Sequence, residues 1–257
     1  MDKVYRAPLA IIMAHLMLSS ICFACRPLNS EDYGVQDKGT WSLESGIQLK
    51  TNRDHSGTNT IDDCLHYGVW DHIEVAVDMP YLSFVSKDIG ESGLGDGTLC
   101  IKYNFISFSG EEGMTLKLSY LINSGDPDKG FGSNENNMTT TLVLTKRFGD
   151  YTCHFNFGYL FDNEPKGTEI DDQIIYNVAV QRPLNDKTNI FAEMNNSIPT
   201  LASEDDEGNV ERESVIEGLI GMTYAINDSL TWDAGIGGGF NKYSSDSNFT
   251  TGMTINF

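Results

Sequence analysis

The sequence is short of basic residues and of long apolar runs, and each shortage excludes a class of protein. Its 257 residues contain 17 Lys and Arg against 37 Asp and Glu, which gives a formal charge of −20. Nucleic-acid binding needs a surplus of Lys and Arg on one face, so we expect no nucleic-acid partner. After the first 24 residues, no apolar run approaches the ~18 residues that a membrane-spanning helix needs.

Catalytic and metal-binding motifs are lacking as well. Beyond the first 24 residues no CxxC pair occurs, and the sequence contains no G-x-S-x-G elbow. The stretch from Asp126 begins like a calcium loop, but Asn137 stands where the bidentate Glu should be. We therefore expect no cofactor, no metal and no enzymatic activity. Cys64, Cys100 and Cys153 are interpreted as buried apolar cysteines, with one disulfide as the alternative.

The N-terminus has the pattern of a secretory signal peptide. Lys3 and Arg6 precede the apolar run "APLAIIMAHLMLSSICFA", which ends in small residues. Cleavage is expected near Ala24, so the mature chain would start at Cys25 and be exported. The alternative is a lipoprotein in which Cys25 is acylated, but Cys22 stands where such signals carry an aliphatic residue.

The rest of the chain is punctuated by tight turns that recur about every 40 residues. Four of them contain an Asp that follows Gly, Asn or Trp, at Asp71, Asp150, Asp186 and Asp228. Asp, Asn and Gly adopt the backbone angles that tight hairpins need. Longer polar connections alternate with these turns. Period-2 alternation in between predicts twelve strands, at residues 40–51, 59–68, 71–81, 96–107, 113–122, 137–148, 150–162, 172–182, 186–197, 212–226, 229–240 and 247–257.

Short turns at one end and long loops at the other are typical of an all-β transmembrane barrel, antiparallel and up-and-down. We predict about 12 strands, with 10–14 as the range, and an even count puts both termini on the short-turn side. Apolar side chains such as Phe155 alternate with polar ones such as His154, as expected for a wall between lipid and a wet interior. A soluble β-sandwich also alternates, but its strands are usually shorter, about 5–6 residues.

The C-terminus supports the barrel. The segment "NFTTGMTINF" continues the alternation to the last residue, Phe257. In lipid no strand edge can be left unpaired, so the last strand must pair with the first. A terminal aromatic of this kind resembles the recognition signal of bacterial outer-membrane barrels. The partners it implies are the barrel-assembly machinery, outer-membrane lipid and lipopolysaccharide.

Strand parity places charges of both signs inside the barrel, where they survive only if they are paired or hydrated. The pore-lining candidates are Glu44, His72, Glu74, Asp78, Lys102, Lys117, Arg147, His154, Glu193, Glu217 and Asp233. Barrels of about 8 strands are filled by side chains and those of 16–18 leave an aqueous pore, so twelve strands suit selective passage of small solutes.

Three hypotheses stay open. The first is a passive channel or facilitator for small molecules, with the inward charges setting selectivity. The second is a structural or surface protein with a closed lumen and acidic extracellular loops. The third, a barrel hydrolase, requires a serine hydrogen-bonded to His154 or to another inward histidine.

Several motifs resemble the outer-membrane family labelled MetA-pathway of phenol degradation. They are "ACRPLNSED", "GTWSLESGIQL", "HYGVWDHIEVAVDMPYL", "GLGDGTLCIKYNF" and "HFNFGY". Two stretches depart from the family pattern: Asn29-Ser30-Glu31-Asp32 replaces Thr-Asp-Asp, and "LINSGDPDKG" lacks Pro-Thr-Gly. The resemblance implies an outer-membrane barrel that serves uptake of small, often hydrophobic or aromatic compounds.

The sequence thus predicts three parts. Residues 1–24 are a signal peptide, residues 25–39 a short periplasmic segment, and residues 40–257 a barrel in the cell outer membrane. The short segment leaves no room for the plug domain of 22-stranded transporters, so movement of solutes would be passive.

Overall fold

A computed structural model describes residues 26–54, 56–85, 90–108, 111–133, 136–161, 172–200, 203–204, 210–211 and 214–257. The predicted signal peptide and Cys25 lie outside the described residues. In the part of the chain that is described, no helix is long and apolar enough to cross a membrane.

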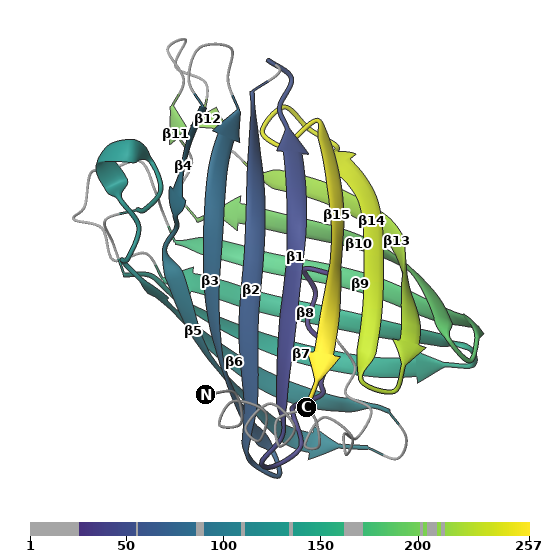
Figure 1. Ribbon diagram of the computed structural model, residues 1–257. Coiled ribbons are helices and arrows are strands. Elements are labelled where there is room, and N and C mark those ends of the chain that lie inside the picture. The colour runs from purple at the N-terminus through teal and green to yellow at the C-terminus, as the bar shows by residue number, and fades with distance from the viewer. Residues whose placement is uncertain are drawn as a thin grey trace, which may run out of the picture.

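Twelve long antiparallel strands form a closed barrel (Figure 1). They are β1 (Trp41–Thr51), β2 (Gly57–Trp70), β3 (Ile73–Val85), β5 (Gly97–Ser107), β6 (Gly113–Ile122), β7 (Met138–Phe148), β8 (Tyr151–Phe161), β9 (Gln173–Asn185), β10 (Thr188–Pro199), β13 (Val215–Asn227), β14 (Leu230–Gly239) and β15 (Ser247–Asn256). Strands that follow each other in the chain are hydrogen-bonded, and β1 pairs with both β2 and β15, which closes the cylinder. The predicted twelve-stranded up-and-down barrel is confirmed.

Tight turns lie at one end of the barrel and longer connections at the other, as predicted (Figure 1). Two-residue turns at 71–72, 149–150, 186–187 and 228–229 join successive strands. Gly149 has a φ of +62°, the left-handed conformation that such hairpins require. At the loop end β3 continues beyond its predicted limit and pairs with an additional short strand, β4 (Gly90–Leu94). The loop ends also contain a short 3-10 helix, η1 (Pro127–Lys129), and a small hairpin of β11 (Ser203–Glu204) and β12 (Val210–Glu211).

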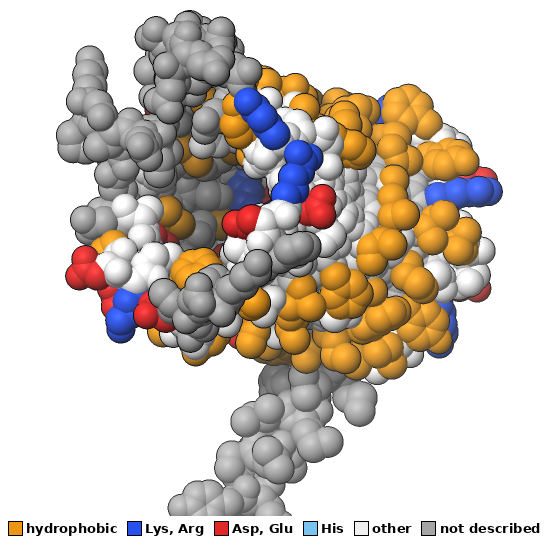
Figure 2. All heavy atoms as spheres, turned by 90° about the horizontal axis from the view of Figure 1, so that it is seen from above, with side chains coloured by type: hydrophobic (Ala, Val, Ile, Leu, Met, Phe, Trp, Pro, Cys, Tyr) orange, Lys and Arg blue, Asp and Glu red, His pale blue; other side chains and the backbone are white. Residues whose placement is uncertain are grey.

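The two faces of the wall differ sharply in chemistry. On β8, Phe155 and Phe157 point outward and are 40% and 59% exposed, whereas His154 and Asn156 point inward and are each 4% exposed. In the view from the loop end, hydrophobic side chains gather on the outer wall (Figure 2). An apolar outer band around a polar interior is the pattern of a barrel that sits in lipid.

The segment before β1 lies inside the barrel, so the expectation of a periplasmic segment at residues 25–39 is wrong for the described residues from 26 on (Figure 1). Its backbone amides hydrogen-bond to the inner wall: Glu31 N–H donates to Asn156 Oδ1 at 2.6 Å, and Tyr33 N–H donates to Thr145 Oγ1 at 3.0 Å. Strand parity cannot place this segment, because the segment is not a strand. The segment lies in the lumen because its polar backbone groups form hydrogen bonds with the polar inner face of the wall.

Candidate functional site

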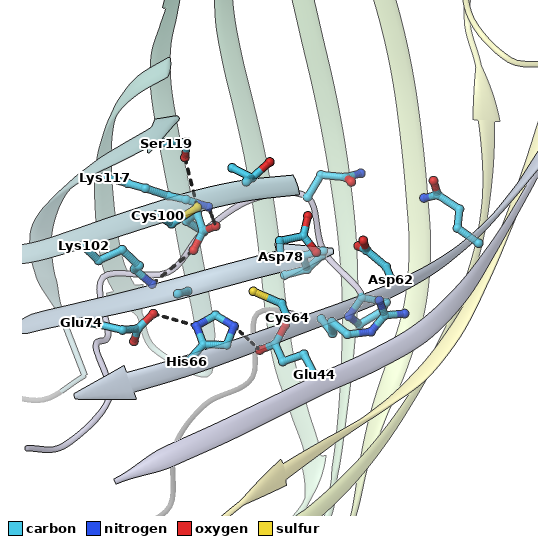
Figure 3. Close-up of a pocket in the computed structure, with 18 of the residues that line it drawn as sticks. Glu44, Asp62, Cys64, His66, Glu74, Asp78, Cys100, Lys102, Lys117 and Ser119 are labelled. Carbon is cyan, nitrogen blue, oxygen red and sulfur yellow. Dashed lines mark hydrogen bonds and ion pairs between the residues drawn. The ribbon is translucent and has the colours of Figure 1, made fainter. Parts of the chain in front are cut away.

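A charged cavity of about 280 Å³ lies between the segment and one side of the inner wall. Residues 26–29 and Glu31 form one side of it, and inward side chains of β1, β2, β3, β5 and β6 form the other. Four carboxyl groups line it on β1 to β3, at Glu44, Asp62, Glu74 and Asp78 (Figure 3). We call it the charged cavity.

His66 joins two glutamates across three strands (Figure 3). Its Nδ1 lies 2.8 Å from Glu74 Oε1, and its Nε2 lies 4.0 Å from Glu44 Oε1. The other oxygen of Glu74 accepts a hydrogen bond from Gln36 N–H at 2.7 Å. Glu74 is only 4% exposed, so a buried carboxylate ties the segment to the wall.

Two lysines from neighbouring strands meet one glutamate of the segment. Lys102 Nζ lies 3.2 Å from Glu31 Oε2, and Lys117 Nζ contacts Glu31 Oε1. Burial opposes ionisation of Glu31, but the attraction of Lys117 and Lys102 outweighs it and holds the pKa of this carboxyl well below its usual range. The segment therefore supplies the counter-charge for two inward lysines of the wall.

The start of the described segment contacts the seam where the barrel closes. Arg26 Nε lies 3.5 Å from Asp233 Oδ2, on β14, and Arg26 Nη2 donates to Thr250 Oγ1, on β15, at 3.2 Å. Further along, Asn29 N–H donates to Glu193 Oε2 at 3.0 Å, and Ser30 N–H donates to the other oxygen. Opposite sides of the wall thus hold the segment across the lumen.

A second cavity of about 570 Å³, the turn-side cavity, is lined by Asp32 and Tyr33 of the segment and by strand ends near the short turns. His154 lines it, with Nδ1 2.9 Å from Thr145 Oγ1. Since Asp32 and Tyr33 line this cavity while residues 26–29 and Glu31 line the first, the segment separates the two.

The structure brings most of the pore-lining candidates into the lumen, in different surroundings. Glu44, Glu74, Asp78, Lys102 and Lys117 line the charged cavity, and Arg147 and His154 line the turn-side cavity. Glu193 and Asp233 are buried against the segment. Glu217 pairs with Lys50, with 2.9 Å between Oε2 and Nζ.

One pore-lining candidate lies outside the lumen, and several residues that line the cavities are not among the candidates. His72 is exposed and lies in the turn between β2 and β3, where alternation has ended, so its assignment to the lumen is wrong. Asp62 shares the inward parity of Cys64 and His66, which is the signal that identifies it in retrospect. Arg26 and Glu31 precede the first strand, and alternation gives no signal for them.

The cysteines and histidines bear on the remaining expectations. Cys64, Cys100 and Cys153 are free, and the first two line the charged cavity, where Cys100 Sγ lies 3.4 Å from Ser119 Oγ. Cys64 and Cys153 are only partly buried, so the interpretation as buried cysteine holds for Cys100 alone.

The inward histidines test the hydrolase hypothesis. His154 contacts Thr145, and no serine hydrogen-bonds to it or to His66 among the described residues. The serine–histidine pair of a hydrolase is therefore not formed at these two positions. No group of three His, Cys, Asp or Glu that could hold a metal occurs in the described ranges.

Comparison by sequence identifies a family. The model of the family described as "Putative MetA-pathway of phenol degradation" matches residues 26–257. A search of curated proteins finds no match.

Comparison by structure finds outer-membrane barrels. The COG4313 outer membrane channel from Pseudomonas putida F1 is similar with a TM-score of 0.70 and 12% identity, over 90% of this chain and 100% of that one. The KdgM porin is similar with a TM-score of 0.57 and 10% identity, over 84% and 99%. The NanC porin follows with 0.55 and 11% identity, over 84% and 98%. At these identities the likeness establishes the fold.

Proposed function

Since the chain belongs to the family of the MetA-pathway of phenol degradation, we propose that it is a passive outer-membrane channel or facilitator for small molecules. The observation that carries the proposal is the pair of cavities inside one barrel, about 280 and 570 Å³ in volume, with residues 26–33 between them. Residues 26–33 form a barrier between the cavities, and polar contacts hold this segment to the wall. It is not part of the hydrogen-bonded wall, so it can move while the barrel stays intact.

The chemistry of the lumen supports a solute that forms hydrogen bonds. Glu44, Asp62, Asp78 and the paired lysines dominate the charged cavity, and desolvating such groups against a wholly apolar molecule is costly. The family description points to phenol degradation, and the resemblance implies hydrophobic or aromatic compounds. Within that range, molecules with polar groups fit this lumen better than pure hydrocarbons. The pore-lining candidates inside the lumen would set selectivity, with carboxyls on β1 to β3 favouring cations.

Cleavage near Ala24 would release the chain into the periplasm for assembly. Trp41 N–H donates to Phe257 O at 2.8 Å and Phe257 N–H donates to Trp41 O at 2.9 Å, so the terminal aromatic lies at the closing seam. This position supports recognition of Phe257 by the barrel-assembly machinery, with outer-membrane lipid and lipopolysaccharide around the finished wall.

The second candidate is a structural barrel with a closed lumen, and the segment inside the barrel favours it. Planar-bilayer conductance tests the channel, because a lumen that the segment alone closes should conduct once the segment is removed or loosened. We expect the chain from Cys25 to be silent or nearly so, and a variant lacking residues 26–35 to conduct at least about ten times more. A variant with residues 29–33 replaced by Gly and Ser keeps the length, loses the contacts, and should conduct too.

Heat-modifiable migration on a gel checks that each variant is folded. Folded variants that all stay silent would overturn the channel and leave the structural barrel.

A further inference from the structure

The seam between β1 and β15 carries a notch on its inner face. Gly46 and Gly252 are direct partners in the register of these strands. A Cβ on Gly252 would lie 2.6 Å from Arg26 Nε, and a Cβ on Gly46 would overlap the same guanidinium. The guanidinium therefore lies over both glycines, where no residue with a side chain leaves room for it.

Acceptors surround this glycine floor. Asp233 is 1% exposed, with Oδ2 3.5 Å from Arg26 Nε. Arg26 Nη2 donates to Thr250 Oγ1 at 3.2 Å and to Thr251 O at 3.4 Å. A flat floor with a buried carboxylate and two oxygen acceptors at its edge matches a planar guanidinium, whose donors lie in one plane, better than a compact ammonium.

We propose that this notch, formed by Gly46, Gly252, Asp233 and Thr250, is a guanidinium-binding site that Arg26 occupies as a tethered ligand. Small planar cations of the guanidine or amidine class compete with Arg26 for it. As a statement about transported solutes, this inference rests on the proposed channel function. As a statement about the site, it does not.

The fit of Arg26 leaves room for a competitor. A charge-assisted N–H···O⁻ bond is typically about 2.7–2.9 Å long, and the Nε–Oδ2 distance of 3.5 Å exceeds this. The other carboxylate oxygen of Asp233, Oδ1, is buried and has no hydrogen-bond partner among the described residues. Arg26 is fixed by its own backbone, whereas a free guanidinium can turn to meet both oxygens of Asp233.

The notch is reached from the charged cavity. Arg26 and Thr250 both line that cavity, which also exposes the carboxyl groups of Glu44, Asp62 and Asp78. These carboxyls attract a cation that enters the lumen and raise its concentration beside the notch. A guanidino solute would thus meet the site that holds the start of the segment.

Isothermal titration of the refolded chain with methylguanidinium tests the site, with methylammonium as the matched probe. Arg26→Ala empties the notch. We expect this variant to bind methylguanidinium at least about tenfold more tightly than wild type does. We also expect the variant to bind methylguanidinium at least about tenfold more tightly than methylammonium. Tenfold corresponds to about 1.4 kcal/mol, roughly one hydrogen bond to a charged group. Adding Gly46→Ala to Arg26→Ala fills the floor and should abolish binding. Adding Asp233→Asn should do the same by removing the charge.

Thr250→Val in the Arg26→Ala background provides a milder test should Gly46→Ala fail to fold, and it should weaken binding several-fold. Equal binding of the two cations, or retained binding after folded Gly46→Ala, would overturn the site. Calorimetry does not depend on conduction. If the segment variants conduct but Arg26→Ala does not bind methylguanidinium, this inference alone is overturned. If Arg26→Ala binds methylguanidinium but all the folded segment variants stay silent, the channel alone is overturned.

Discussion

Phe157 and Asn156 are neighbours on β8, yet they belong to different environments. Phe157 is 59% exposed on the outer wall, where it lies opposite Leu142 of β7. Asn156 is 4% exposed on the inner wall, where its side chain accepts from Glu31 N–H and donates to Glu31 O at 2.9 Å. The outer face needs only apolar surface, which many residues supply. The inner face needs particular partners, and the N-terminal segment provides many of them.

The largest effect is expected from a charge on the outer face. Phe157→Arg would place a guanidinium near the middle of the lipid-facing wall, at a cost of about 2–4 kcal/mol in the free energy of unfolding. Urea titration in lipid vesicles, followed by heat-modifiable migration, measures the change. Phe157→Leu is the control and should cost far less. A loss below about 1 kcal/mol for Phe157→Arg would mean that this face does not contact hydrocarbon.

A smaller, more local effect is expected on the inner face. Glu31→Gln removes the counter-charge that faces Lys102 and Lys117 and should loosen the segment by about 1–3 kcal/mol, the cost of an unmatched buried group. Hydrogen exchange should show faster exchange at residues 29–36 and little change in the strands. Glu112→Gln, which removes an ion pair with Lys146 at the turn end, is the control. Equal protection of residues 29–36 in wild type and Glu31→Gln would show that charge pairing does not hold the segment.

The contrast between the outer and inner faces of the wall explains how much of the fold and of the site the sequence could predict. Alternation located β8 and β15 to within one or two residues, because each outward position needs only to be apolar and each inward one polar. It also placed Glu74 and Lys102 inside. It could not place residues 26–40, because they have no strand period. Their position depends on contacts with at least eight different strands of the wall.

His72 and Asp62 mark the limits of parity itself. The prediction places His72 inside because it starts the strand at residue 71, two residues before β3 begins. The turn at 71–72 removes His72 from the wall. Asp62 has the inward parity of Cys64 and His66, yet it is not one of the pore-lining candidates. What no pattern shows is which inward charges meet, since that depends on registers between strands far apart in the sequence.

The smallest effect is expected at the loop end, where backbone amides hold a carboxylate. No basic side chain among the described residues forms an ion pair with it. Asp96 Oδ1 accepts from Ser124 N–H at 3.0 Å and from Gly125 N–H at 2.8 Å, and Oδ2 accepts from Ser133 N–H at 2.7 Å. Burial raises the pKa of Asp96, but these hydrogen bonds outweigh it and lower the pKa below its ordinary value. The carboxylate therefore fixes the loop around η1, whose Phe131 stacks on Phe84 at 5.2 Å.

Because the folded-state pKa of Asp96 is depressed, its contribution is full above the ordinary pKa of aspartate and is lost as the pH falls through the lower, folded value. Proteolysis of this loop by an acid-active protease should accelerate in that acid range while the barrel stays intact. Asp96→Asn should be cleaved rapidly at every pH at which the protease is active, and should lose the pH dependence that the loop itself contributes. A pH dependence that persists in Asp96→Asn would assign the titration to another group. Loss of the pH dependence in Asp96→Asn would show that amide hydrogen bonds to Asp96 hold the loop end. Ion pairs hold the N-terminal segment inside the lumen.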